Sequence, residues 1–100
     1  MQQKPAVVMY STQVCPYCVR AKMLLQRRGI PFEEIDVTSD HEKRMWLVKT
    51  TGRRTVPQIF IHDQPIGGSD ELHDLDRSGE LQKLLANQAP PLSLRERGRG

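Results

Sequence analysis

The sequence lacks the long apolar runs and the strong charge bias that identify several classes of protein. No segment of its 100 residues approaches the roughly 20 apolar residues of a membrane span. No signal-peptide core follows Met1-Gln2-Gln3-Lys4-Pro5. We therefore predict a cytoplasmic chain without membrane association. A chain of this length allows a single domain with one core.

The net charge of +3 is too small and too poorly placed to indicate nucleic-acid binding. Three arginines and one glutamate put two of these charges into Pro90–Gly100, which also contains a Pro-Pro pair. A nucleic-acid footprint should instead lie on the folded part of a chain. We predict a domain over residues 1–88, a basic, disordered tail over residues 89–100, and no nucleic-acid partner.

Hydrophobic patterning predicts the element order β-α-β-α-β-β-α. The expected strands are Ala6–Tyr10, Phe32–Val37, Gln58–Ile61 and Gln64–Ile66. The expected helices are Pro16 to about Arg28, about Asp40 to Thr51, a third that is capped by Ser69 or Gly68 and ends at Ser78-Gly79, and Glu80–Ala86. We predict an α/β fold with a mixed four-stranded sheet and helices on both faces, in which Pro65 marks an edge strand.

Helical spacing also predicts which side chains form the core. The expected core residues of the first two helices are Cys18, Ala21, Leu24, Leu25, Leu47 and Val48. We expect Trp46 to be a partly buried ring on the flank of the second helix. Ser39 and Glu42 have the spacing of a capping box, which predicts that Ser39 caps this helix.

The chemistry of the chain is expected at Cys15-Pro16-Tyr17-Cys18, a Cys-x-x-Cys pair between a predicted strand and a predicted helix. The unpaired N–H groups and the dipole at a helix N-terminus stabilise a thiolate. We therefore expect Cys15 to be the attacking thiolate in disulfide exchange. Cys18 lies nearly one turn later and faces inward, so we expect it to react second, as the resolving thiol.

Two other interpretations of the cysteine pair are less favourable. A structural zinc site needs four ligands, and the histidines at 41, 62 and 73 are scattered without the spacing of a zinc finger. A purely structural disulfide would close too short a loop to stabilise the chain much. We therefore predict no metal site.

Three motifs together make the chain resemble the glutaredoxins, specifically the small bacterial dithiol class. The motifs are Cys15-Pro16-Tyr17-Cys18, Thr55-Val56-Pro57 and Gly67-Gly68-Ser69-Asp70. The resemblance covers about residues 5–86 and implies a thioredoxin-like fold. It also implies a monomer without a tightly bound cofactor, which uses glutathione as cosubstrate. The implied substrates are disulfide-containing or glutathionylated proteins.

The resemblance further implies a glutathione site. A cis peptide bond before Pro57 would leave the backbone of Val56, next to Thr55, open to pair with the cysteinyl part of the ligand. The N–H groups at Gly68 and Ser69 would bind the γ-glutamyl carboxylate, and Asp70 its ammonium group. From the sequence alone, a trans proline that opens an edge strand is favoured over the cis form. Ser69 and Asp70 can also form a plain helix cap, which is compatible with ligand binding.

Two further residues belong to this implied site. Tyr17 would flank the ligand and shield the thiolate. Arg44 would bind the glycine carboxylate of glutathione. An exposed helix arginine that binds no ligand is an equally favoured alternative.

One residue departs from the family pattern. Many members carry a lysine three residues before the first cysteine, where this chain has Thr12. A cation there would help to hold the thiolate and the ligand carboxylate, and it could be replaced here by Lys22, Arg44, Arg53 or Arg54.

Two alternative functions remain open. One is a glutaredoxin-like protein reduced by thioredoxin reductase, although such proteins lack the Gly-Gly-x-Asp pocket. The other is an iron–sulfur cluster protein, although members specialised for cluster delivery carry Cys-Gly-Phe-Ser at the active site.

Overall fold

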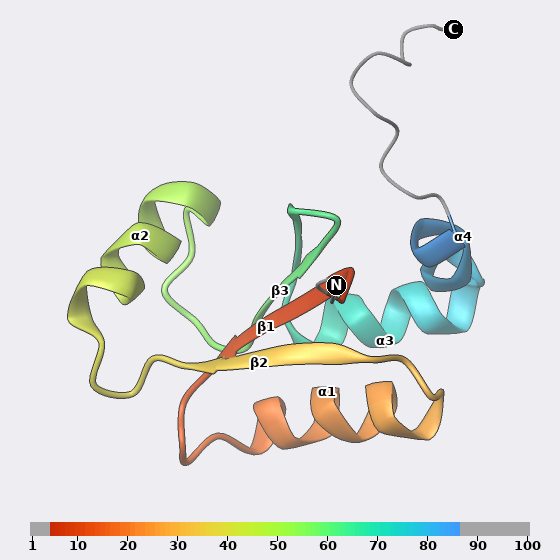
Figure 1. Ribbon diagram of the computed structural model, residues 1–100, viewed down its shortest axis with the longest axis horizontal. Helices are drawn as coiled ribbons and strands as arrows, with labels where there is room; N and C mark the ends of the chain where they lie inside the picture. The colour runs from red at the N-terminus through yellow and green to blue at the C-terminus, as the bar shows by residue number, and fades with distance from the viewer. Residues whose placement is uncertain (1–4, 87–100) are drawn as a thin grey trace, which may run out of the picture.

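The computed structural model describes residues 5–86, which form one sheet and its flanking helices (Figure 1). The elements are β1 (Val7–Ser11), α1 (Pro16–Arg27), β2 (Phe32–Asp36), α2 (His41–Thr51), β3 (Gln58–Ile61), β4 (Gln64–Gly67), α3 (Ser69–Ser78) and α4 (Glu80–Ala86). None of the helices in this range is long and apolar enough to cross a membrane. The tail predicted over residues 89–100 and its boundary at residue 88 lie outside the described residues.

The four strands form a mixed sheet in the order β2-β1-β3-β4, which confirms the predicted fold class. The pair β1 and β2 is parallel, with Val7 opposite Phe32, whereas β3 runs antiparallel to both β1 and β4. The edge position of β4 suits Pro65, which has no N–H to donate to a further strand. This order puts β1, which leads into the cysteine pair, in the interior of the sheet.

One face of the sheet packs against α1, α3 and α4 and forms the main core. Its fully or nearly buried members are Val7, Met9, Ala21, Leu24, Leu25, Ile30, Ile59, Ile61, Leu72 and Leu81. Cys18 is also buried, so the inward positions predicted on α1 are confirmed. The packing of α1 onto this core fixes the end of the helix that carries the cysteines.

The opposite face of the sheet is covered by α2, and Figure 1 shows α1 and α2 on either side of the strands. Three aromatic rings make this contact: Tyr10 on β1, Phe60 on β3 and Trp46 on α2. Their centroids lie 5.5 to 5.9 Å apart. Trp46 remains 43% exposed, which confirms a partly buried ring on the helix flank. Helices therefore lie on both faces, as predicted.

The start of α2 differs from the prediction. Asp40, not Ser39, caps the helix, and its carboxylate accepts a hydrogen bond from the Lys43 backbone N–H at 2.9 Å. The backbone N–H of Asp40 donates to the Val37 carbonyl, so Ser39 is held within a turn that precedes the helix. Val48 on the same helix is only half-buried, in contrast to its predicted core position.

Candidate active site

Cys15 occupies the position that the sequence predicts, immediately before the first turn of α1. Its backbone is extended, Pro16 is the first helical residue, and the Cys15 sulfur accepts a hydrogen bond from the Cys18 backbone N–H at 3.1 Å. The sulfur therefore takes the place of a capping oxygen at the positive end of the helix. This geometry stabilises negative charge on Cys15 and leaves the residue partly exposed to a substrate.

Cys18 differs sharply from Cys15 although both are free thiols. The Cys18 side chain is only 3% exposed. Burial, together with the hydrogen bond to the Cys15 side chain, raises the pKa of Cys18 to about 12. Cys18 is therefore a protonated thiol at neutral pH, as expected for a residue that reacts second.

The Thr55–Pro57 segment lies directly beside the cysteine pair. The Val56–Pro57 peptide bond is cis, which confirms the expectation from the resemblance. The Cys15 thiol lies 3.8 Å from the Val56 carbonyl oxygen, with the sulfur as donor. This contact joins the N-terminus of α1 to the loop that precedes β3.

A cleft of about 240 Å³ runs from this loop to the start of α3. Its lining includes every residue predicted to contact glutathione except Arg44, namely Tyr17, Thr55, Val56, Pro57, Gly68, Ser69 and Asp70. Because Val56 both lines the cleft and contacts Cys15, a ligand in the cleft can present a sulfur atom to Cys15. The structure thus brings the three sequence motifs together.

Arg53 and Glu71 also line the cleft, and sequence reasoning did not place Glu71 there. The Glu71 carboxylate accepts a hydrogen bond from the Gly68 backbone N–H at 2.8 Å, and this bond lowers the pKa of Glu71. Arg53 lies 3.4 Å from the same carboxylate. The glycine at 68, followed three residues later by Glu71 at the third position of α3, is the signal that a capping analysis could have used.

This capping bond changes which N–H groups at α3 are open to a ligand. The Gly68 N–H is occupied by Glu71, whereas the N–H groups of Ser69 and Asp70 lie in the first turn, where a helix offers no internal acceptor. An anion at this helix end would therefore meet the Ser69 and Asp70 N–H groups. The position of Gly67 is restricted to glycine, because its φ is +115° and an added Cβ would lie 2.7 Å from Glu71 Cγ.

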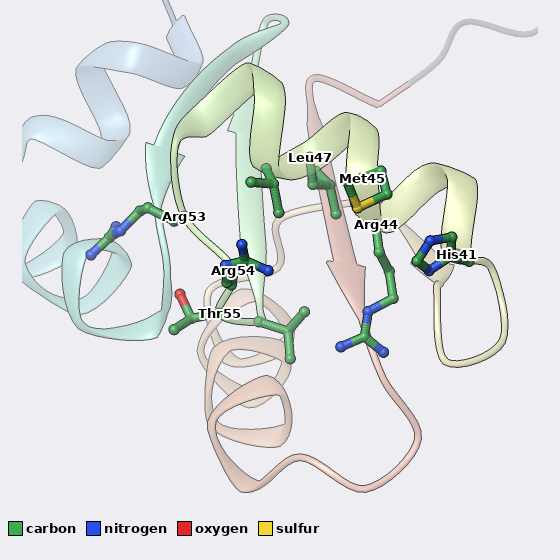
Figure 2. A pocket seen from close by; sticks show the side chains of 9 residues that line it. His41, Arg44, Met45, Leu47, Arg53, Arg54 and Thr55 are labelled. Carbon is green, nitrogen blue, oxygen red and sulfur yellow. The ribbon is translucent and has the colours of Figure 1, made fainter.

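Arg44 lines a separate hollow of about 150 Å³ beneath α2, together with Arg54 and His41. Thr55 and Val56 line both this hollow and the 240 Å³ cleft, so the two adjoin. Arg53 also lines the hollow, and Figure 2 shows Arg44 and Arg53 on opposite sides of Arg54 and Thr55. The hollow is strongly basic and lies within reach of the cleft's end at Val56.

The cations proposed as replacements for the lysine missing at Thr12 fall into two groups. Lys22 lies 2.9 Å from a Glu34 carboxylate oxygen, and Arg53 is paired with Glu71. Among residues 5–86, no carboxylate lies within ion-pair distance of Arg44 or Arg54. In the same range, no three acidic, histidine or cysteine side chains converge as a metal site would require.

Comparisons with known proteins agree with this geometry. The family model described as glutaredoxin matches residues 7–66. A glutaredoxin of Pseudomonas aeruginosa is 50% identical over 82 residues, which are 82% of this chain and 98% of that protein. The solution structure of a glutaredoxin from Brucella melitensis is 44% identical, with a TM-score of 0.73 over 82% of this chain and 89% of that one. A buckwheat glutaredoxin–glutathione complex is 31% identical, with a TM-score of 0.77 over 83% of this chain and 78% of that one.

Proposed function

Because the chain belongs to the glutaredoxin family and is a thiol–disulfide oxidoreductase, we propose that it takes electrons from glutathione. Its substrates are then protein disulfides and glutathione mixed disulfides. The observation that supports this proposal is the position of Cys15 beside the 240 Å³ cleft, with the Val56 carbonyl in contact with both. A buckwheat relative of the same fold has been solved with glutathione.

In the first branch of the proposed reaction, Cys15 acts alone. Its thiolate attacks the glutathione sulfur of a glutathionylated protein, the disulfide bond breaks, and the protein leaves as a thiolate. The thiolate of a second glutathione then attacks the glutathione sulfur of the Cys15 adduct. This step releases oxidised glutathione and restores the Cys15 thiolate, which the N-terminus of α1 stabilises.

In the second branch, Cys15 attacks a protein disulfide and forms a mixed disulfide with one of its sulfurs. Cys18 then loses its proton and attacks Cys15, so that the substrate leaves as a dithiol and a Cys15–Cys18 disulfide remains. Two glutathione molecules reduce this disulfide. The buried Cys18 is suited to this role because it is close to Cys15 and shielded from external disulfides.

The cleft supports a specific placement of glutathione. In this proposal the cysteinyl backbone of the ligand pairs with the backbone of Val56, beside Thr55 and Pro57. The γ-glutamyl carboxylate binds the N–H groups of Ser69 and Asp70, next to Gly68, and the Asp70 carboxylate binds the ammonium group.

The other two proposed contacts lie at the sides of the ligand. Tyr17 is 54% exposed at the edge of the cleft, where its ring can cover the bound tripeptide. The glycine end of the ligand then extends past Val56 toward the adjoining basic hollow, where Arg44 and Arg54 can meet its carboxylate. We further propose that the protein acts as a cytoplasmic monomer with no tightly bound cofactor.

Intact-mass analysis of a Cys18→Ser variant tests the cosubstrate and the nucleophile together. The variant is treated with oxidised glutathione and mapped by peptide mass, with Cys15→Ser as the matched control. We expect one glutathione adduct on Cys15, which reduced glutathione removes, and no adduct in the control.

An adduct that only a thioredoxin system reduces, or no adduct at all, would refute glutathione dependence. Thr12 would then mark a loss of glutathione use, and thioredoxin reductase would be the candidate electron donor.

A further inference from the structure

A second cleft opens on the other side of the cysteine pair. It has a volume of about 320 Å³, and it shares no lining residue with the 240 Å³ cleft. Its lining consists of Ser11, Thr12, Gln13, Cys15, Cys18, Val19, Lys22, Glu34 and Asp36. Both cysteines therefore border a second, charged space that the proposed glutathione site does not use.

An ion pair is fixed in this cleft. Lys22 Nζ lies 2.9 Å from one carboxylate oxygen of Glu34, and the Ser11 hydroxyl donates to the other oxygen at 2.8 Å. Burial opposes the ionised form of Glu34, but the hydrogen bonds from Lys22 and Ser11 outweigh it and lower its pKa. Glu34 is therefore a carboxylate throughout the neutral range.

The ion pair faces Cys18 from two elements. Lys22 is four residues after Cys18 on α1, so both side chains lie on the same face of the helix. Glu34 comes from β2, where it is paired with Met9 of β1. The negative charge of Glu34 is one of the influences that disfavour the thiolate of Cys18.

We propose that the Lys22–Glu34 pair controls the reactivity of Cys18, and through it the rate at which a mixed disulfide on Cys15 is resolved within the protein. The inference rests on the proposed function only for the identity of the substrates. Cys18 can attack the mixed disulfide that any disulfide substrate forms with Cys15. Glu34 opposes the thiolate of Cys18. In this proposal Lys22, a cation that lines the same cleft, favours it. Burial keeps Cys18 a thiol, and the two opposite charges, which share a cleft with it, adjust how readily that thiol is deprotonated.

The step that the ion pair would control is a disulfide exchange within the protein. Cys18 releases its proton to solvent, and its sulfur attacks the Cys15 sulfur of the mixed disulfide. The Cys15–Cys18 bond forms as the bond from Cys15 to the substrate sulfur breaks, and the substrate leaves as a thiolate. Charge near Cys18 changes the fraction of attacking thiolate. A tenfold change in that fraction, partly offset by the change in nucleophilicity, alters the rate about threefold.

The test compares Glu34→Gln, Lys22→Met and the double variant in an assay that contains no glutathione. An aromatic disulfide, dithiobis(nitrobenzoate), reacts at Cys15 and releases one coloured thiol, and attack by Cys18 then releases a second. We expect the second phase to be at least about threefold faster in Glu34→Gln and at least about threefold slower in Lys22→Met. The double variant should return to within about twofold of the original rate.

Glu33→Gln is the matched control, since it removes the same charge from the neighbouring position of β2. Burial, and then the charge of Glu33, raise the pKa of Tyr10, which places Glu33 on the aromatic face of the sheet, away from Cys18. We expect no change in the second phase for this variant. The Lys22 and Glu34 side chains are 36% and 32% exposed, so replacing them should leave the fold intact.

The direction of the changes separates control by charge from a structural role. If the pair only holds α1 against β2, both single variants should change the rate in the same direction and the double variant should not recover. That result, or equal rates in all variants, would overturn the proposal.

The pH profile of the second phase gives an independent measurement, because only control by charge shifts it to lower pH in Glu34→Gln. Asp36 and Cys15 are the other titratable groups that line the cleft. The absence of a glutathione adduct on Cys15 would refute the proposed function and leave this assay unaffected.

Discussion

The burial of Cys18 predicts that the reduced protein loses stability at alkaline pH. The pKa of Cys18 is raised from 9.0 to about 12, first by burial and then by the hydrogen bond to Cys15. Between these two values the folded chain retains a proton that the unfolded chain has lost. The stabilisation from this proton is complete below pH 9 and is lost as the pH rises toward 12.

The magnitude follows from the size of this window. Each pH unit above the pKa of the unfolded thiol removes about 1.4 kcal/mol from the free energy of unfolding. At about pH 10.5, midway through the window, the loss from Cys18 alone is about 2 kcal/mol. A loss of this size is a large part of the stability of a domain of 100 residues.

The assay is urea unfolding under a phosphine reductant, followed by the fluorescence of Trp46, the one tryptophan of the chain. The control is Cys18→Ala, which lacks the titration but retains every other group that ionises in this range, including Tyr10. Between neutral pH and about pH 10.5, the free energy of unfolding of the original chain should fall by about 2 kcal/mol more than that of Cys18→Ala. If both lose stability in parallel, the buried environment of Cys18 does not hold its proton, and the reasoning is refuted.

Three further predictions test the core and the cleft. Leu72→Ala should lower the free energy of unfolding by about 2–5 kcal/mol in urea denaturation, because Leu72 is fully buried. Gly67→Ala should lower the Tm, because the new Cβ would lie 2.7 Å from Glu71 Cγ at a φ of +115°, and a Tm equal to that of the original chain would contradict this clash. Asp70→Ala should raise KM for a glutathionylated peptide about tenfold and change kcat less than about twofold, as steady-state kinetics would measure. Asp74→Ala removes a carboxylate from the same helix outside the cleft, and an equal rise in KM there would argue against a direct ligand contact by Asp70.

The fold could be predicted from the sequence because its elements have strong local signals. Apolar spacing on α1 determines which side chains face the core, and Pro65 indicates the edge strand without any tertiary information. The error at the start of α2 has the opposite origin. Ser39 and Asp40 are both good caps, and the choice depends on the hydrogen bond from the Asp40 N–H to the Val37 carbonyl, which sequence spacing does not reveal.

The candidate site also contains features that local sequence determines and features that depend on tertiary contacts. The cysteine motif is local, so the capping position of the Cys15 sulfur could be predicted from a strand followed by a helix. The bond from Gly68 to Glu71 is also local but was not recognised, because glycine has no side chain to suggest a capping box. The pairing of Lys22 with Glu34 could not be predicted. It depends on the parallel register that sets Met9 beside Glu34 across two strands far apart in the sequence.

This division has a chemical consequence for the two cysteines. The position of Cys15 depends mainly on the first turn of its own helix, so a short motif is sufficient to place its sulfur at the helix N-terminus. Cys18 depends on burial against the sheet and on charges that β2 brings into the second cleft. Two chains with the same tetrapeptide can therefore share the first step of the reaction and differ in the rate of the second. In the proposed reaction, the balance between the branch that uses Cys15 alone and the branch that uses both cysteines is then a property of the tertiary structure around Cys18.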